Sequence, residues 1–404
     1  EYHSLRSGNR SSARTPLHAD PSFGHTGTSP LLLHAVLINE TTVIAEEMDA
    51  PRINKWLKPL SALYGVGVRL RNYLFDKNVL ISNSFDIPIV CVGNITIGGT
   101  GKTPHVEYLI RLLHPRYRIA VVSRGYKRKT KGMIVATEGS TAWDIGDEPR
   151  QIKRKYPDLT VIVDADRSRA IGYLCDLAEE QRPQLIILDD GFQHRKVKAD
   201  LNIVLTDYNR ILTKDYLLPA GRLREPAGSI QRADMVILTK CPDDLAPIDL
   251  RAAKRDLALY PHQKLFFSKF LYGQGLKPLF SDQSPSAEVR SALVIAGIAS
   301  PKLFLREIRT RFPSGTDRIY PDHHEFTDRE VCLLIQDWHE LHRKDANAIV
   351  VCTEKDAMRL ALRQSSFPQE MQERFYYLPV EVKLMFDQEK VFVDRLLGVI
   401  QHKK

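Results

Sequence analysis

Short apolar runs alternate with helix-length segments through the middle of this 404-residue chain, and no other feature constrains its fold as strongly. The apolar runs predict strands at residues 87–92, 119–123, 160–163, 185–188, 201–206 and 235–239. Strands separated by helices form βαβ units, which build a mainly parallel sheet covered by helices. A second set follows, with strands at 292–296 and 348–352 and a helix at 328–342. We therefore expect an α/β protein with two α/β domains, the second one smaller.

The segment GGTGKTP, residues 98–104, follows the first apolar run and is typical of a phosphate-binding loop. The P-loop pattern is G-x-x-x-x-G-K-[ST], in which backbone N–H groups surround phosphate oxygens. Thr96 stands where that pattern has its first glycine, but two glycines inside the loop supply backbone freedom. We expect nucleotide contacts from Gly98, Gly99, Thr100, Gly101, Lys102 and Thr103. The alternative is a glycine-rich turn in which Lys102 is a solvated surface charge.

Acidic residues follow the apolar run at 185–188, where the chain reads Asp189, Asp190 and Gly191. Phosphoryl transfer needs a carboxylate at the end of a neighbouring buried strand, within reach of Mg²⁺. The pattern does not decide which of the two aspartates contacts the metal, and a turn-forming loop is the plain alternative. Gln193 and His194 follow on the same turn.

Further polar clusters follow other predicted strands, which is where open α/β sheets build their sites. They are SRGY at 123–126, GDEP at 146–149, DADR at 164–167 and RLREP at 222–226. The segment PDHHEF, residues 321–326, adds an imidazole. A proton-transfer role, or a plain surface loop without a role, fits this segment better than metal binding.

Residues 53–75 combine Trp, Tyr and Leu side chains with lysines and arginines and contain no acid. This composition favours a helix at a membrane interface, where cations meet lipid phosphates. The alternative is an amphipathic helix packed on the protein. No stretch reaches the roughly 18 apolar residues that a spanning helix needs, so we expect no integral membrane protein.

The net charge of +9 indicates an anionic partner, and nucleic acid, phospholipid and a phosphorylated substrate all fit it. No nucleic-acid reading motif accompanies the charge, so we expect no nucleic-acid partner. The five cysteines are scattered without a C-x-x-C pair, which argues against a zinc site or a disulfide framework. A reducing compartment fits this pattern.

Eight segments in this order closely resemble the tetraacyldisaccharide 4'-kinase family of lipid A biosynthesis: VGNITIGGTGKTP, SRGY, GDEP, LDDGFQHR, LLPAGRLREP, AGI, PDHHEF and TEKDA. The resemblance extends from about residue 50 to near the carboxyl end, and Thr96 in the loop is itself a feature of that family. The segments DIGDEPRQIKRKYP, LNIVLTDYNR and TKCPDDLAPID are similar to versions from the Bacteroidetes group, which favours a bacterial source.

The resemblance implies transfer of the γ-phosphoryl group of ATP, with Mg²⁺, to the 4'-hydroxyl of tetraacyldisaccharide 1-phosphate, giving lipid IVA. It implies a peripheral protein on the cytoplasmic face of the bacterial inner membrane, which binds an anionic acylated disaccharide and contacts the membrane through its amphipathic helix. We also expect a monomer.

Site residues carry over from the family motifs one by one. Lys102 and Thr103 are expected to hold ATP and Mg²⁺, and Lys102 to neutralise charge on the moving phosphoryl group. The acidic shell on the metal side would be Asp189, Asp190 and Glu225. Asp147 and His323 match the catalytic pair that takes the proton of the sugar hydroxyl, and His323 fits the D-H pattern where His324 does not. Positions that match substrate and nucleotide contacts are Tyr126, Arg167, Gln193, His194 and Arg224.

We expect four parts of the chain, with a seam at 241–247. These are a disordered extension (1–47), an amphipathic membrane-interface helix region (48–84), a P-loop kinase domain (85–245) and a C-terminal α/β domain that closes the active-site cleft (246–404). Two interpretations of residues 1–47 remain open: a transit peptide, or an over-extended reading frame before Met48.

Two other functions fit parts of the same pattern. One is a P-loop kinase that acts on a soluble small molecule, with the amphipathic helix merely packed on the core. The other is a P-loop GTPase or metallochaperone, which is disfavoured because neither TKCP at 239–242 nor TEKD at 353–356 fits the guanine-reading N-K-x-D element.

Overall fold

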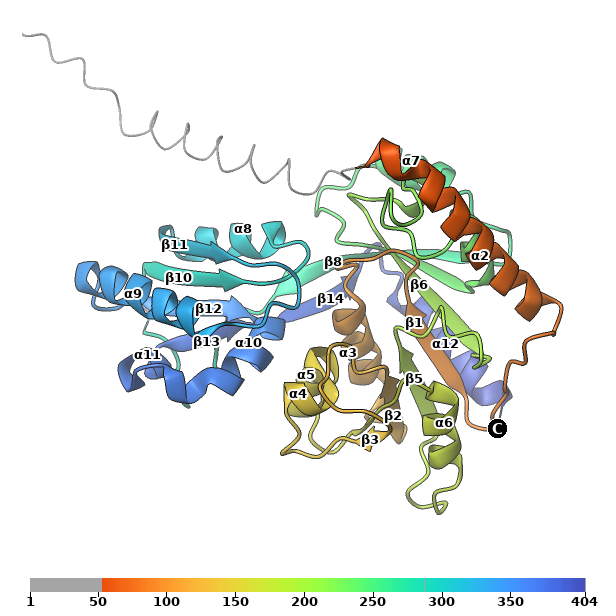
Figure 1. Ribbon diagram of the computed structural model, residues 1–404, viewed down its shortest axis with the longest axis horizontal. Coiled ribbons are helices and arrows are strands. Elements are labelled where there is room, and N and C mark those ends of the chain that lie inside the picture. The colour runs from red at the N-terminus through yellow and green to blue at the C-terminus, as the bar shows by residue number, and fades with distance from the viewer. Residues whose placement is uncertain (1–52, 287, 404) are drawn as a thin grey trace, which may run out of the picture. The chain divides into compact units, whose positions relative to one another are not determined.

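The computed structural model describes residues 53–403 except residue 287 (Figure 1). The expected disordered extension at 1–47, and residues 48–52 of the next expected part, lie outside the described residues.

Nine strands form the larger sheet: β1 (Ile89–Gly93), β2 (Ile119–Ser123), β3 (Ile134–Val135), β4 (Thr160–Val163), β5 (Leu185–Asp189), β6 (Leu201–Asp207), β7 (Met235–Thr239), β8 (Lys264–Tyr272) and β14 (Val380–Leu384). Its accompanying helices are η1 (Lys55–Leu57), α2 (Lys58–Asp76), α3 (Lys102–Leu113), α4 (Ala142–Ile145), α5 (Asp147–Lys155), α6 (Arg167–Cys175), η2 (Leu212–Lys214), η3 (Ala227–Arg232), α7 (Pro247–Leu257) and α12 (Glu389–His402).

Five strands form the smaller sheet: β9 (Lys277–Pro278), β10 (Ser291–Ala296), β11 (Ser314–Ile319), β12 (Ile349–Thr353) and β13 (Phe375–Leu378). Its helices are α8 (Lys302–Arg311), α9 (Asp328–Lys344), α10 (Glu354–Leu360), η4 (Ala361–Ser366) and α11 (Gln369–Glu373).

The larger sheet has the strand order β14-β8-β7-β6-β1-β5-β2-β4-β3. Its central pairs are all parallel, whereas β3 and β14 pair antiparallel at the two edges. The smaller sheet, in the order β11-β10-β12-β13-β9, is parallel except for β9. The predicted α/β fold, with a mainly parallel sheet flanked by helices and a smaller second sheet, is confirmed.

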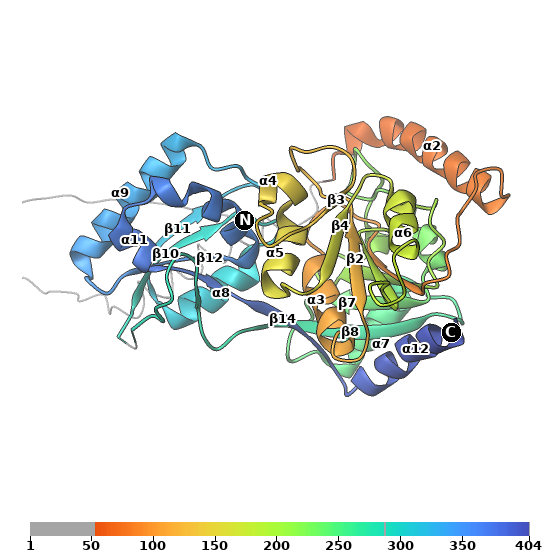
Figure 2. The ribbon, with the colours of Figure 1, turned by 90° about the horizontal axis from the view of Figure 1, so that it is seen from below.

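The central strands of both sheets are buried on their two faces, which explains why these strands read as continuous apolar runs, whereas the edge strand β11 is polar and mostly exposed. In β1, Ile89 and Cys91 belong to the core that α6 and α7 cover, while Val90 and Val92 face the core that α3 and α12 cover. Helices α8 and α9 lie on opposite sides of β10–β12 (Figure 2). Burial of alternate residues against helices on each side is the main stabilising contribution to such a layered core.

The boundary expected at residue 245 does not separate the two sheets. β8 extends the larger sheet beside β7, and the chain returns to pair β14 with β8, Val380 opposite Tyr272 and Leu384 opposite Ser268. The final helix α12 packs Phe392, Leu396 and Ile400 into the core of the larger sheet. Residues 241–246 are therefore a loop before α7, and the chain passes between the sheets after β8 and after β13.

The acid-free segment 53–75 forms η1 and α2, as predicted. Helix α2 lies along the outside of the larger sheet (Figure 1), where Ser61 donates a 3.0 Å hydrogen bond to the carbonyl of Leu217. Gly65 lies so close to Leu217 that an added Cβ would come within 2.7 Å of its side chain. Within the described residues, no helix has the length and hydropathy to cross a membrane.

Candidate active site

The glycine-rich loop connects β1 to α3, and Lys102 is the first residue of the helix. Gly98 and Gly101 have φ angles of 111° and 86°, a region that favours glycine. At Gly101 an added Cβ would also lie 2.7 Å from the ring of Phe270. The loop therefore places backbone amides at a helix N-terminus, a position suited to phosphate binding.

Asn94 organises this loop, and the sequence analysis did not single it out. Its amide nitrogen donates to the hydroxyls of Thr96 and Thr100 at 3.3 and 2.8 Å, and its side-chain oxygen accepts from Lys102 at 3.4 Å. The backbone of Thr96 pairs with Leu223 in an antiparallel bridge. Thr96 does not have a positive φ angle, so its position does not demand the usual glycine.

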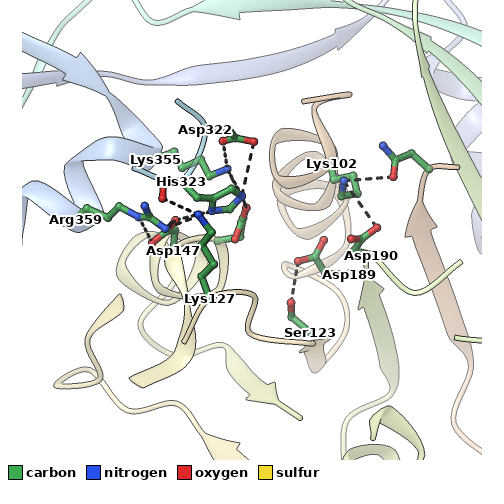
Figure 3. A network of polar contacts seen from close by, with 12 residues as sticks. Lys102, Ser123, Lys127, Asp147, Asp189, Asp190, Asp322, His323, Lys355 and Arg359 are labelled. Atoms are coloured by element: carbon green, nitrogen blue, oxygen red, sulfur yellow. Dashed lines mark hydrogen bonds and ion pairs between the residues drawn. The ribbon is translucent and has the colours of Figure 1, made fainter. Parts of the chain in front are cut away.

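Asp189 is the last residue of β5 and Asp190 follows it, and the two carboxylates have different partners (Figure 3). Burial, together with Asp190 and Glu148, raises the pKa of Asp189 to about 7. Burial also opposes ionisation of Asp190, but Lys102 and Arg224 outweigh it and hold the pKa of Asp190 below its usual value. Asp190 contacts Arg224 at 3.0 Å and Lys102 at 3.8 Å. Asp189 accepts a 3.1 Å hydrogen bond from Ser123.

The expected metal-side residues fit a cation. In the described part of the chain no salt bridge reaches Asp189, and Lys102 offsets only part of the effect of burial, which raises the pKa of Asp189. Glu225 accepts hydrogen bonds from Asn72 and Arg232 through Oε2, but its buried Oε1 has no partner. Thr103 lies in the first turn of α3. Among the described residues, these acids do not form a group of three with ligand atoms within 4.8 Å of one another, so a divalent cation would take its ligands from only part of this set.

A cavity of about 860 Å³ brings most of the predicted site residues together. Its lining includes the loop residues Gly98, Gly99, Thr100, Gly101, Lys102 and Thr103, and the polar side chains of Tyr126, Arg167, Asp189, Asp190, Gln193, Arg224, Glu225 and His323. His194 is not part of this lining, and burial, with Arg167 nearby, lowers its pKa to about 4. Gln193 donates a 2.7 Å hydrogen bond to the carbonyl of Asn94 and so connects the β5 turn to the loop.

Asp147 and His323 meet although 176 residues separate them along the chain. Asp147 begins α5, and its Oδ2 lies 2.9 Å from Nδ1 of His323, in the loop between β11 and α9. His323 has a φ angle of 59°, and so does Lys127 at 57°, which donates to the His323 carbonyl. Such strained backbone is common at functional sites. His324 instead contacts Glu330 at 2.9 Å.

Only one member of this pair borders the large cavity. His323 lines it, whereas Asp147 is 3% exposed and lines a smaller cavity of about 290 Å³, with Lys127 bordering both. Burial opposes ionisation of Asp147, but hydrogen bonds from His323 and Arg359 lower the pKa of Asp147 overall. Asp147 is thus an ionised partner behind the imidazole.

Four residues around this pair were not assigned from the sequence. Lys355 contacts Nε2 of His323 at 2.9 Å, and Arg359 contacts both oxygens of Asp147 (Figure 3). Glu148 and Asp322 complete the cluster through Lys355, at 3.1 and 2.9 Å. The only available signals were the motifs themselves, GDEP, PDHHEF and TEKDA, which contain three of these four residues.

Among residues 53–403, one group of His and acidic side chains is close enough to hold a metal ion: Asp147, Glu148 and His323, with ligand atoms within 4.8 Å of one another. Lys355 and Arg359 already contact these same groups. A metal ion there would have to displace two side-chain cations, so this cluster fits proton handling better.

Comparisons with known proteins agree with these features. A family model described as Tetraacyldisaccharide-1-P 4'-kinase matches residues 53–401. The tetraacyldisaccharide 4'-kinase of Porphyromonas gingivalis is 99% identical over 357 residues, covering 88% of this chain and 100% of that protein. The tetraacyldisaccharide 4'-kinase of Parabacteroides distasonis is 48% identical over 352 residues, covering 86% of this chain and 94% of that protein.

A crystal structure of LpxK from Aquifex aeolicus in complex with ATP has a TM-score of 0.64 and 28% identity, covering 85% of this chain and 98% of that one. The resemblance inferred from the eight motifs, including its Bacteroidetes character, is thereby confirmed. The chain belongs to the tetraacyldisaccharide 4'-kinase family.

Proposed function

We propose that this protein transfers the γ-phosphoryl group of ATP to the 4'-hydroxyl of tetraacyldisaccharide 1-phosphate and forms lipid IVA. Family membership supports the reaction. The single observation that carries the assignment of residues is that one cavity is lined both by the loop around Lys102 and by His323. A phosphate-binding loop and a proton acceptor on one cavity are what transfer to a hydroxyl requires.

The loop around Lys102 is the proposed site for the phosphates of ATP. Its backbone amides and the ammonium of Lys102 would hold the β- and γ-phosphates. Arg224 and Arg167 line the same cavity and would offset charge that spreads over the moving phosphoryl group. Preorganised cations lower the barrier because they need no rearrangement during the transfer.

Mg²⁺ would be held by Thr103 with Asp189 or Asp190, and Glu225 would support this shell. When bound, the ion would neutralise phosphate charge. The raised pKa of Asp189 and the unpartnered Oε1 of Glu225 favour this assignment.

His323 is the proposed acceptor of the hydroxyl proton. The oxygen of the 4'-hydroxyl forms a bond to the γ-phosphorus, the bond from that phosphorus to the bridging oxygen breaks, and ADP leaves with the electron pair. The hydroxyl proton passes to Nε2 of His323, while Asp147 holds Nδ1–H at 2.9 Å and stabilises the imidazolium that forms. Arg359 keeps Asp147 ionised and oriented.

Helix α2 is the proposed contact with the membrane that carries the acylated acceptor. Trp56 beside it is 93% exposed and Leu63 is 71% exposed, an unusual arrangement for a water-facing helix. Basic residues accompany these apolar side chains, and no acid precedes Asp76 in the helix. Such a helix lies in a headgroup region with its apolar side chains dipped into the acyl layer.

This arrangement supports a peripheral protein on the cytoplasmic face of the inner membrane, where ATP is available. The glycine-rich loop and His323 line one cavity within a single chain, so the proposed reaction needs no residue from a second copy.

The decisive experiment measures transfer of labelled γ-phosphate from ATP to tetraacyldisaccharide 1-phosphate in mixed micelles with Mg²⁺. The parent protein should form product, whereas Lys102→Ala and Asp147→Asn should lower kcat by about 10²–10⁴-fold. His324→Gln is the control for the neighbouring histidine, because His324 contacts Glu330 and does not line the cavity. This variant should keep parental activity. A folded, ATP-binding parent that forms no product, or that phosphorylates a soluble sugar equally well, would refute the proposal.

A further inference from the structure

The hydrogen bonds of His323 define which ring nitrogen carries the proton. Lys355 Nζ lies 2.9 Å from Nε2, and an ammonium group can only donate. Nε2 is therefore assigned as the acceptor of the Lys355 ammonium, and the ring proton is assigned to Nδ1, where the 2.9 Å contact with Asp147 is shorter than the 3.4 Å contact with the Arg359 guanidinium. This is the tautomer that a general base needs if its Nε2 is to receive a proton. Glu148 Oε1 also faces Nε2, at the longer distance of 3.4 Å.

Lys355 has an acceptor for each of its three N–H groups. Besides Nε2 of His323, its ammonium contacts Asp322 Oδ1 at 2.9 Å and Glu148 Oε1 at 3.1 Å. Burial works against the charge of Lys355, but Glu148 and Asp322 raise its pKa above the usual value. Lys355 thus stays an ammonium and is not itself an acceptor for the hydroxyl proton.

Helix α10 holds both members of the Asp147–His323 pair. Lys355 and Arg359 lie four residues apart and therefore on one side of the helix; one contacts His323 and the other contacts Asp147 at 2.8 Å. The start of α10 is fixed by Thr353, whose hydroxyl accepts from the backbone of Asp356, and by a 2.8 Å hydrogen bond from Gly297 to Asp356. A fixed helix gives both cations fixed positions.

We propose that Lys355 is a positioning residue for the phosphoryl transfer. Lys355 keeps Nε2 of His323 unprotonated by donating a hydrogen bond to it, until the substrate hydroxyl takes the place of Lys355 at Nε2. This inference rests on the proposed function. When the hydroxyl arrives, Lys355 leaves Nε2 but keeps Asp322 and Glu148 as partners, so no buried charge is left unpaired.

The charges of the cluster suit this exchange. Asp147, Glu148 and Asp322 face two cations, Lys355 and Arg359, which leaves one negative charge in excess while His323 is neutral. Lys127 contacts the backbone carbonyl of His323 and not the ring, so it lies outside this group of side-chain contacts. The one excess negative charge among the five side chains around the imidazole is balanced when the hydroxyl proton reaches Nε2. The electron pair of the broken phosphorus–oxygen bond leaves with ADP.

The test compares Lys355→Met and Lys355→Arg with Lys155→Met. Lys155 is the matched control, because it also bridges two carboxylates, Glu107 at 2.7 Å and Glu354 at 3.3 Å, but contacts neither member of the pair. Three quantities are measured for each variant: kcat with the KM for ATP in the micelle assay, the melting temperature, and the ¹⁵N signals of the His323 ring. The ring signals are assigned by their loss in His323→Gln.

Lys355→Met should lower kcat about 100-fold and change the KM for ATP by less than about threefold, since general-base catalysis contributes about 10²–10⁴-fold. Lys355→Arg should recover kcat to within about tenfold of the parent, because it still donates to Nε2 and the two acids. In the parent protein, the ¹⁵N signal of His323 Nε2 should be that of an unprotonated nitrogen that accepts a hydrogen bond. Lys355→Met should shift this signal. Lys155→Met should lower the melting temperature and leave kcat within about threefold.

Parental kcat in Lys355→Met, equal losses of kcat in Lys355→Met and Lys155→Met, or a parental ring signal with the proton on Nε2 would each overturn the inference. If Lys355→Met does not fold, the kcat of Lys355→Arg and the ¹⁵N signals of His323 in the parent still test the inference. The ring signals are recorded without acceptor, so they test the contact between Lys355 and His323 even if the parent fails to phosphorylate the lipid, a result that would refute the proposed function alone.

Discussion

The side-chain amide of Asn72 on α2 donates a 3.0 Å hydrogen bond to Glu225, which lines the large cavity. The same helix contacts two neighbours of Glu225 in the site: Tyr64 donates to the carbonyl of Arg224 at 2.8 Å, and Arg71 donates to the carbonyl of Gln193 at 2.7 Å. The helix that exposes apolar side chains to the surroundings therefore also positions part of the candidate active site.

Replacing two exposed leucines of α2 should separate membrane contact from folding. Leu63→Gln combined with Leu70→Gln removes apolar side chains that are 71% and 57% exposed, so the melting temperature should not fall. Binding to anionic vesicles should weaken at least about tenfold, because each buried leucine contributes about 1.5–3 kcal/mol. Co-sedimentation measures this, with Ile248→Gln on α7, 63% exposed, as the control. Equal vesicle binding by the double variant and the parent would exclude α2 as the contact.

Removing the Asn72 amide should affect catalysis without affecting vesicle binding. Asn72→Ala leaves Glu225 with Arg232 alone, and the loss of a hydrogen bond to a carboxylate costs about 1–3 kcal/mol. We expect kcat in micelles to fall about tenfold while co-sedimentation stays parental. Asn209→Ala, in an exposed turn after β6, provides a control outside these contacts. A vesicle-binding defect with normal kcat would contradict a positioning role for Asn72.

Asp189 should make the protein free of nucleotide and metal less stable as the pH rises. Burial, with Asp190 and Glu148, raises its pKa to about 7, whereas an unfolded aspartate titrates near 4. The folded state then binds more protons than the unfolded state between about pH 4 and pH 7, so the free energy of unfolding falls across that window. The loss of stability caused by ionising Asp189 is absent below about pH 4 and complete above about pH 7.

The unfolding free energy of Asp189→Asn should therefore equal that of the parent near pH 4 and exceed it by about 1–3 kcal/mol at pH 8. The variant should lose activity. Denaturant titrations at both pH values measure this difference. Asp243→Asn, at an 80% exposed surface ion pair, should change little at either pH. A variant that is less stable than the parent at pH 8 would show that the carboxylate of Asp189 is already compensated.

Alanine should have opposite effects at two glycines. Gly101→Ala places a Cβ 2.7 Å from Phe270 at a φ angle of 86°, and should lower the unfolding free energy by about 1–3 kcal/mol and weaken ATP binding. Gly67→Ala meets no atom within 4 Å in the interior of α2 and should stabilise by about 0.5–1 kcal/mol. Thermal melts and ATP calorimetry test both variants, and unchanged ATP binding in Gly101→Ala would remove the loop from the nucleotide site.

Local patterns predicted the elements well but not their long-range partners. The apolar runs at 119–123 and 235–239 coincide with β2 and β7, because strands buried on both faces require continuous apolar residues. The expected boundary at residue 245 was wrong because β8 and β14 join the larger sheet from the far side of that boundary. Their pairing depends on a chain that leaves and returns, which no local periodicity records.

The candidate site shows the same division. His194 was carried over with Gln193 from one motif, yet only Gln193 lines the cavity: it donates to the carbonyl of Asn94, whereas His194 lies 3.9 Å from Asp166. Lys355 lies in a motif that the sequence analysis quoted, but its role depends on the position of α10 beside the loop of His323.

The sequence by itself determined the alternation of strands and helices, the phosphate-binding loop, the acid-free helix and the family. These properties are encoded in neighbouring residues, through side-chain periodicity, glycine conformations and ordered motifs. Only the tertiary structure decided which carboxylates form ion pairs, which nitrogen of His323 contacts Lys355 and which helix supports that histidine. Those properties depend on distances between groups far apart in the chain, and electrostatic and hydrogen-bond energies are set by such distances and by burial.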